Sequence, residues 1–169
     1  MAFHVGDPIM HWTYGLGNII ALEERAISDV KKLYYAVKIK DLTVWVPLDD
    51  DVNIHLRPPT AAAEFKELFA ILAQPGESLP DDRQERKLHL LDKLKDGRAE
   101  SLCQVISSLT SYQQVRALNE TDQSLMKRAR SALLGEWTYA LAVSLPDAET
   151  ELRRLLDSGR SKAQAKAQP

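Results

Sequence analysis

The chain has 169 residues, of which 44% are hydrophobic and 27% charged, a composition that excludes a disordered protein and allows one ordinary domain or two small ones. Its net charge of −2 excludes a global attraction to nucleic acid, so any contact with DNA must come from a local basic patch. Cys103 is the single cysteine, which excludes an intrachain disulfide and favours a reducing cytoplasm.

The first third of the chain is predicted to form β-strands. Apolar, aromatic and β-branched residues recur with short spacing in four segments: "FHVGDPIMHW", "NIIALEERAI", "LYYAVKI" and "LTVWVPL". "ISDVKK" and "KIKD" are candidates for hairpin turns between them. Short strands at such close spacing indicate a small, strongly bent sheet in residues 1–57.

The spacing of apolar residues changes from that of strands to that of helices after Arg57-Pro58-Pro59, which cannot continue a central strand. Residues 60–157 are predicted to form a helical domain, and the polar residues 158–169 a flexible tail. The predicted helices occupy residues 61–74, 81–97, 99–109, 119–137 and 146–159.

Several residues are expected to end or orient these helices. Thr60 is a good N-cap for the first helix, and Asn119 and Asp122 could form a capping box at the fourth. In the second helix, leucine spacing places Leu88, Leu91 and Leu94 toward the core.

The "YGLGN" stretch raises the question of a phosphate-binding loop. A dinucleotide loop needs a helix after it and a third glycine, whereas a strand-like run follows Gly15 and Gly17 here. We therefore expect these glycines to allow a tight bend or the close approach of another backbone segment.

No candidate for catalysis or metal binding emerges. None of the four histidines has a second histidine, cysteine or carboxylate at ligand spacing, and Cys103 lies among apolar residues with no base nearby in sequence. We expect a non-enzymatic protein with no cofactor and no metal. The N-terminus lacks a signal-peptide pattern, and no run of about 18 apolar residues could span a membrane.

Two basic clusters are candidates for binding phosphates. Arg83, Arg86 and Lys87 have the spacing to share one helical face, but acidic residues lie among them, so an ordinary salt-bridged surface is an equal alternative. Lys127, Arg128 and Arg130 form the second cluster.

Trp45 is a candidate anchor for a partner. If Val44 and Val46 face the core, Trp45 faces the other way, because side chains alternate along a strand. The alternative is that a helix of the second half covers it.

Together these residues resemble the CarD/CdnL family of bacterial transcription regulators. The resemblance lies in Phe3, Val5, Gly6 and Asp7, then in "YGLGNI", "DLTVWVP" and "LMKRARSALLGEWTYALA", and it extends to about residue 157. It implies an α+β protein, with a Tudor-like small β-barrel, similar to the polymerase-interacting domain of the transcription-repair coupling factor, followed by an all-α helical bundle. It also implies that the β-domain binds the RNA polymerase β subunit, and that the helical domain contacts promoter DNA at the upstream fork and modulates open-complex stability.

Two positions depart from the family pattern. Arg83 stands where relatives carry a tryptophan that wedges into the minor groove, and Trp45 stands where relatives often place a basic residue used against polymerase. Arg25 matches a basic position that the family uses for polymerase binding.

We therefore expect a cytoplasmic, monomeric, CarD-like transcription regulator that binds DNA weakly on its own. Arg25 and Trp45 are the expected polymerase contacts. The expected DNA contacts are Arg83, Arg86, Lys87, Lys127, Arg128 and Arg130. The alternative is a polymerase-binding adaptor that has lost its contact with DNA.

Overall fold

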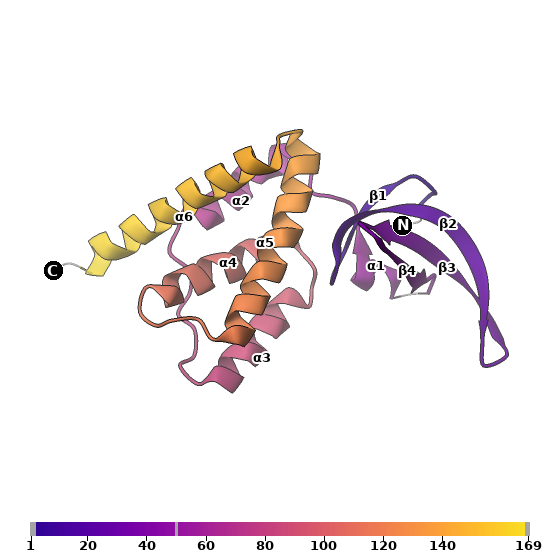
Figure 1. Ribbon diagram of the computed structural model, residues 1–169, viewed down its shortest axis with the longest axis horizontal. Helices are drawn as coiled ribbons and strands as arrows, with labels where there is room; N and C mark the ends of the chain where they lie inside the picture. The colour runs from indigo at the N-terminus through magenta and orange to yellow at the C-terminus, as the bar shows by residue number, and fades with distance from the viewer. Residues whose placement is uncertain (1–2, 50, 168–169) are drawn as a thin grey trace. The chain divides into compact units, whose positions relative to one another are not determined.

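The computed structural model describes residues 3–49 and 51–167, and the chain divides into two compact units, residues 1–59 and 60–169 (Figure 1). We call them the sheet unit and the helical unit. This arrangement confirms the predicted α+β class, with a Tudor-like β-domain followed by a helical domain.

Within residues 3–49 and 51–59, the sheet unit contains five antiparallel strands in the order β4-β3-β2-β1-β5. The strands are β1 (Pro8–His11), β2 (Gly15–Ile27), β3 (Val30–Ile39), β4 (Leu42–Pro47) and β5 (Leu56–Arg57), with the short helix α1 (Val52–His55) before β5. The sequence did not predict α1 or β5, because both are too short to show a hydrophobic period. In this order, β4 and β5 form the two edges of the sheet.

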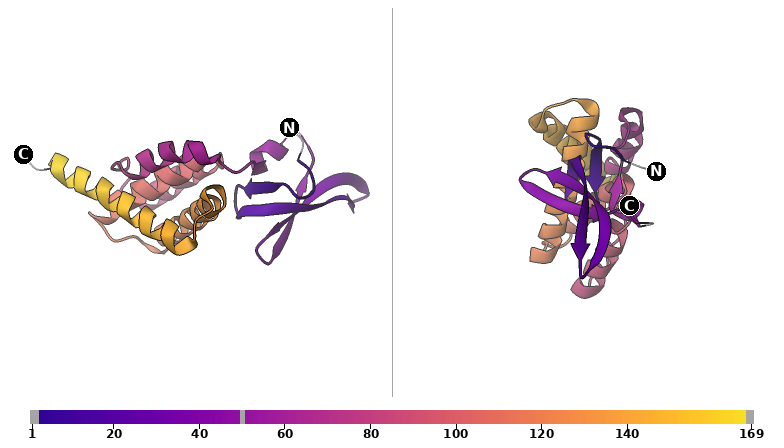
Figure 2. Two further views of the ribbon diagram at one scale, coloured as in Figure 1. Left: turned by 90° about the horizontal axis from the view of Figure 1, so that it is seen from above. Right: turned by 90° about the vertical axis from the view of Figure 1, so that its right-hand side faces the viewer.

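A long curved hairpin of β2 and β3 dominates this unit (Figures 1 and 2). Its turn consists of Ser28 and Asp29, whose φ angles of 51° and 64° are those of a type I′ turn. A register shift between Ile19 and Ala21 marks a β-bulge, which increases local bending. Both predicted hairpin turns are confirmed, since Lys40 and Asp41 connect β3 to β4.

The two glycines of "YGLGN" have separate structural roles. Gly15 has a φ of 88°, which favours glycine where the β1–β2 turn enters β2. A Cβ atom on Gly17 would lie 2.6 Å from the carbonyl oxygen of Lys38 and 2.5 Å from Ile39 Cγ1. Gly17 therefore lets β3 approach closely, and the expectation of a structural role rather than a phosphate loop is confirmed.

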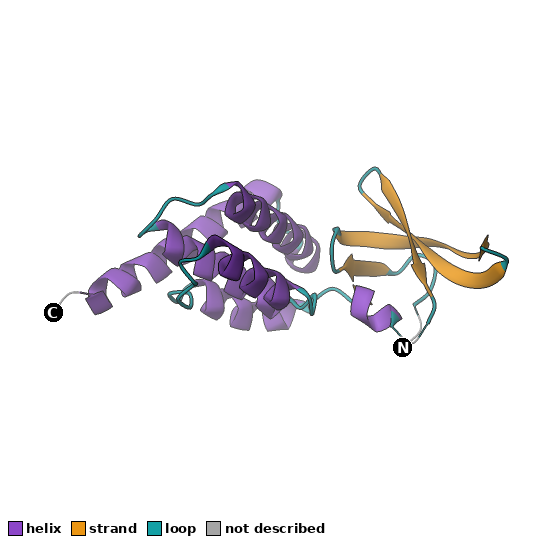
Figure 3. Cartoon of the chain, turned by 90° about the horizontal axis from the view of Figure 1, so that it is seen from below, coloured by secondary structure: helices purple, strands orange, loops and turns teal. Residues whose placement is uncertain are grey.

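The helical unit is built around α4 (Ala99–Gln113), which contacts each of the other long helices. These are α2 (Phe65–Leu72), α3 (Arg83–Leu94), α5 (Glu120–Leu141) and α6 (Leu145–Ala167), and a 3-10 turn, η1 (Ala62–Glu64), precedes α2. Figure 3 shows the helices of this unit in purple and the loops that join them in teal. The predicted capping box is confirmed, because Asn119 accepts a hydrogen bond from Asp122 N at 2.8 Å and Asp122 accepts one from Asn119 N.

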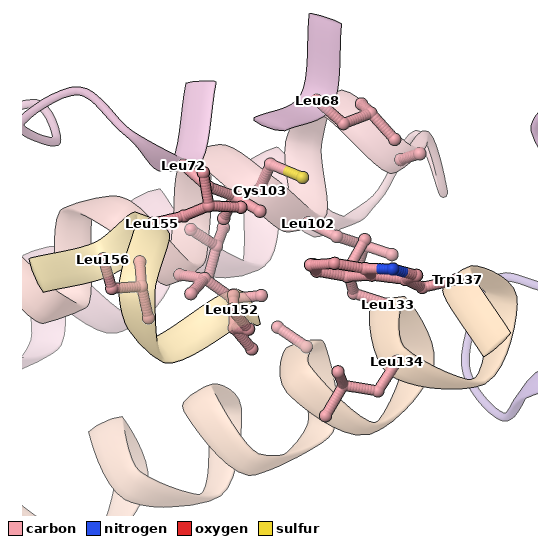
Figure 4. Packing of buried hydrophobic residues seen from close by; sticks show 14 of the residues in the cluster. Leu68, Leu72, Leu102, Cys103, Leu133, Leu134, Trp137, Leu152, Leu155 and Leu156 are labelled. Atoms are coloured by element: carbon pink, nitrogen blue, oxygen red, sulfur yellow. The ribbon is translucent and has the colours of Figure 1, made fainter. Parts of the chain in front are cut away.

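Apolar side chains of these helices form one core that includes Trp137 of α5. Figure 4 shows part of this core, with labelled residues from α2, α4, α5 and α6. Cys103 lies within it, and burial raises the pKa of its thiol well above the ordinary value. A thiol kept protonated among leucines is a small apolar side chain, as expected from its sequence neighbours.

Three expectations for the helices were wrong. Thr60 does not cap the first helix: its backbone N–H donates to Glu136 Oε2 at 2.7 Å, and α2 starts only at Phe65. On α3, Leu94 is buried and Leu91 packs against the core as predicted, but Leu88 is 57% exposed, and the other buried residues are Arg86 and Leu90. The segment expected to be a polar tail is helical up to Ala167, where Lys162 donates to the carbonyl oxygen of Ala73 at 3.0 Å.

Candidate functional site

The outer face of the sheet is the first candidate site. The strand register places Ala21, Ala36 and Trp45 side by side on β2, β3 and β4, and side chains two residues along each strand share that face. Trp45 is 40% exposed, whereas Val46 on the opposite face is 3% exposed. The predicted alternation is therefore correct.

Trp45 is held by two side chains of β2. Its indole Nε1 donates to Glu23 Oε2 at 2.9 Å, and the guanidinium carbon of Arg25 lies 4.2 Å from the centre of the indole ring. A cation at this distance over an aromatic face is attracted by the ring. The structure thus brings together the two residues predicted to bind polymerase, and adds Glu23 to them.

Sequence reasoning missed Glu23, although the signal was present. Glu23 and Arg25 are two residues apart on one strand, so they share a face. With two-residue turns after Ile27 and Ile39, counting along the two hairpins places Glu23 and Arg25 on the same face of the sheet as Trp45.

Trp45 belongs to an edge strand. β4 pairs with β3 on one side, and within the described residues no strand pairs with its other side. An edge strand presents unpaired backbone N–H and C=O groups that can receive another strand. The outer face and the β4 edge therefore adjoin each other.

The second candidate site lies at the start of α3. Asp82 caps this helix by accepting from Gln84 N and Glu85 N, and Arg83 and Lys87 on its first turns are exposed. An open groove of about 500 Å³ lies between these turns and the start of α5, lined by Arg83, Gln84, Lys87, Asn119, Glu120 and Thr121. Two cations and two helix N-termini make this groove favourable for an anion, with Glu120 as an opposing charge.

Arg86 does not belong to this basic surface, which corrects its assignment as a DNA contact. Its side chain is 4% exposed and forms an ion pair with Asp122, Nη2 to Oδ2 at 2.9 Å. The spacing from Arg83 and Lys87 suggested a shared face, but residue 86 lies toward the core, in line with Leu90 and Leu94. Arg86 therefore cannot reach a phosphate without breaking a buried ion pair.

The three basic residues of α5 do not share one face. At 3.6 residues per turn, Arg128 and Arg130 point about 160° apart. Arg128 is seven residues after Thr121, so it follows the stripe that borders the groove, about 10 Å further along the helix. By the same spacing, Lys127 follows Glu120, which also lines the groove. Arg83, Lys87, Lys127 and Arg128 are therefore the basic residues that could contact one ligand, and Arg130 points elsewhere.

Other kinds of site find no support in the described part of the chain. Among residues 3–49 and 51–167, no three His, Cys, Asp or Glu side chains are grouped so as to hold a metal ion. No described helix is both long enough and apolar enough to cross a membrane.

Comparison with known proteins matches both units to domains of the same family. Residues 3–58 match the CarD-like/TRCF RID domain, and residues 67–153 match the C-terminal domain of CarD. The chain is also 30% identical over 138 residues to the "Putative transcription factor YdeB" of Bacillus subtilis (strain 168), covering 79% of this chain and 89% of that protein.

Proposed function

The chain belongs to the CarD family of transcription regulators, and from that premise we propose that its sheet unit binds the RNA polymerase β subunit while its helical unit contacts promoter DNA at the upstream fork. The protein then acts in the cytoplasm as a monomer, without a cofactor, and modulates the stability of the open complex. The single observation that carries the proposal is the Arg25–Trp45 stack on the exposed face beside the β4 edge.

The surface around Trp45 has the properties of a polymerase-binding site. Tryptophan and arginine are enriched among the residues that dominate binding energies at protein interfaces. The adjoining edge of β4 could accept a strand of the β subunit, with backbone hydrogen bonds giving affinity and the Trp45 and Arg25 side chains giving specificity.

The helical unit supports a weaker, electrostatic contact with DNA. Arg83 and Lys87 place two positive charges in the α3–α5 groove, and Lys127 and Arg128 lie further along α5. Two or three phosphate contacts give weak binding at physiological salt. Binding to polymerase would raise the effective concentration of this surface at the promoter and so make a weak contact effective.

The affinity of the β subunit for Trp45→Ala tests the proposal. We expect a loss of about 2 kcal/mol, roughly 30-fold, because Trp45 is a large side chain already ordered by two partners. Trp12→Ala is a matched control, since Trp12 is 39% exposed in the same unit but packs against His55, away from Glu23 and Arg25. Equal affinities of the wild type and a folded Trp45→Ala variant would contradict the proposal.

The structure also favours a second candidate, a polymerase-binding adaptor without useful DNA contact. Arg86 is buried and forms an ion pair with Asp122, and position 83 has an arginine in place of the tryptophan wedge that the family resemblance implies. A mobility assay on fork-junction DNA, with and without polymerase, separates the two candidates. If the double variant Arg83→Ala, Lys87→Ala forms the DNA complex and the polymerase–DNA complex with the same affinity as the wild type, the protein is better described as an adaptor.

A further inference from the structure

We propose that Glu23 is a positioning residue of the polymerase-binding surface, which holds the Trp45 indole so that Trp45 and Arg25 meet the partner as one preformed unit. This inference rests on the proposed polymerase binding and deepens it. Glu23 is itself no anchor: it acts through the hydrogen bond that its Oε2 accepts from Trp45 Nε1 at 2.9 Å.

The strand order shows why the indole needs a partner on β2. Trp45 is on β4, Glu23 and Arg25 are on β2, and β3 lies between them. Two strand spacings amount to about 9.6 Å, so the indole must reach across β3 to meet both residues. It can do so because its direct neighbour on β3 is the small Ala36, which is 1% exposed.

Two contacts fix the indole from different directions. The N–H···O bond to Glu23 holds its polar edge, and the Arg25 guanidinium, 4.2 Å from the ring centre, holds a ring face. An interface side chain that is already ordered in the free protein loses less conformational entropy on binding. Glu23 also satisfies the only polar group of the indole, so the partner needs no acceptor for it.

Glu23 further affects the charge of this face. Arg25 and Lys32 are direct cross-strand partners, and two like charges in that position repel each other. The carboxylate of Glu23 lies on the same face and partly offsets this repulsion. Removing the Glu23 carboxylate therefore has two opposite effects on the affinity for an acidic partner. The Trp45 indole is no longer held by a hydrogen bond, which weakens binding, but the face becomes more positive, which strengthens it.

Four variants separate these effects. Glu23→Ala removes both the acceptor and the charge, whereas Glu23→Gln removes the charge and keeps an oxygen acceptor. Glu24→Ala is the matched control, because Glu24 faces the other side of the sheet and pairs with Lys31 at 3.7 Å. Trp45→Phe removes the indole N–H while keeping an aromatic ring, so it serves as the background for a double-mutant cycle.

Two measurements are made on the full-length protein: the Kd for the isolated polymerase β subunit, and the hydrogen exchange rate of the Trp45 indole N–H by ¹⁵N NMR. We expect Glu23→Ala to weaken binding about fivefold and to speed indole exchange, with Glu23→Gln and Glu24→Ala within about twofold of wild type. In the Trp45→Phe background, Glu23→Ala should change the Kd by less than about twofold.

Three results overturn the inference. The first is that Glu23→Ala weakens binding as much in the Trp45→Phe background as in the wild type, which would mean that Glu23 contacts the partner directly. The second is unchanged indole exchange in Glu23→Ala. The third is a Glu23→Gln defect as large as that of Glu23→Ala, which would make charge the cause. Absence of wild-type binding would instead overturn the proposed function, and the indole exchange rates would still decide whether Glu23 holds Trp45.

Discussion

Arg86 and Asp122 form a two-pronged buried ion pair, with Nε 3.0 Å from Oδ1 and Nη2 2.9 Å from Oδ2. The two residues are 4% and 1% exposed. Arg86 Nη1 also donates to the carbonyl oxygens of Pro80 and Asp81 and to the Tyr112 hydroxyl. One guanidinium thus links the start of α3, the end of α4 and the start of α5, and the hydrogen bond to Asp122 raises the pKa of Arg86 above its already high ordinary value.

Removing this guanidinium should destabilise the helical unit strongly. Arg86→Ala leaves the Asp122 charge buried without its partner, a change that typically costs about 3–5 kcal/mol. Arg83→Ala is the matched control, because Arg83 is exposed on the same helix, and its effect should stay within about 0.5 kcal/mol. Denaturant unfolding followed by circular dichroism measures both variants. Similar midpoints for the two would show that the Arg86–Asp122 pair does not stabilise the fold.

Glu136 should be essential for the start of the helical unit. It is 0% exposed, and its Oε2 accepts the backbone N–H of Thr60 at 2.7 Å. Glu136→Gln keeps the size and an oxygen acceptor, so we expect a loss of about 1 kcal/mol, whereas Glu136→Ala also leaves a cavity and should lose about 3 kcal/mol. Thermal unfolding compares the two. Equal losses would mean that the hydrogen bond to Thr60 is not what makes Glu136 important.

One exposed ion pair predicts a small pH dependence. The Lys93 ammonium donates to Glu77 Oε2 at 2.9 Å and lowers the Glu77 pKa below its ordinary 4.5. Because the folded-state pKa is the lower one, the pair stabilises the protein above pH 4.5, and this contribution is lost as the pH falls through the folded pKa. Glu77 is 65% exposed, so solvent screening should keep the contribution below about 0.5 kcal/mol.

The test of this pH dependence compares the unfolding free energies of the wild type and Glu77→Gln at about pH 7 and about pH 3. The difference between them should shrink at the lower pH, and Lys93→Gln should show the same trend. A difference that grows on acidification would have the wrong sign for this ion pair.

Local features of the fold could be predicted from the sequence because their causes are local. The capping box depends on Asn119 and Asp122, three residues apart, and the hairpin turns depend on the residues between two strands. The outward direction of Trp45 follows from alternation along a single strand. In each case the residues that determine the structure are neighbours in the sequence.

The wrong predictions share a non-local cause. The core face of α3 was predicted from leucine spacing, but it includes Arg86, whose partner Asp122 is 36 residues away. An arginine in a helix is expected at the surface until its partner is known, so the sequence placed Leu88 rather than Arg86 on the core face and assigned Arg86 to DNA. Thr60 likewise binds Glu136, 76 residues away, and no local pattern reveals that contact.

The proposed DNA contact of the helical unit should depend on the chemistry of Arg83. An aromatic wedge inserts an apolar plane between bases, and the contacts in the distorted DNA offset the cost of unstacking. A guanidinium is charged and prefers phosphate oxygens or a narrow minor groove. With Arg86 buried, Arg83 and Lys87 remain on α3, so their two phosphate contacts should contribute only about −2 to the salt slope of DNA binding.

Two variants should therefore act in opposite directions on the open complex. Arg83→Trp places a tryptophan where the family resemblance implies a wedge, and we expect it to lengthen the open-complex lifetime by about tenfold, which corresponds to about 1.4 kcal/mol. Lys87→Ala should shorten the lifetime and reduce the salt slope by about one. Lifetimes are measured on one promoter at several salt concentrations, with Arg130→Ala as the control because Arg130 points about 160° away from Arg128. If Arg83→Trp and Lys87→Ala both leave the lifetime unchanged while polymerase still binds, α3 does not contact DNA and the protein acts as an adaptor.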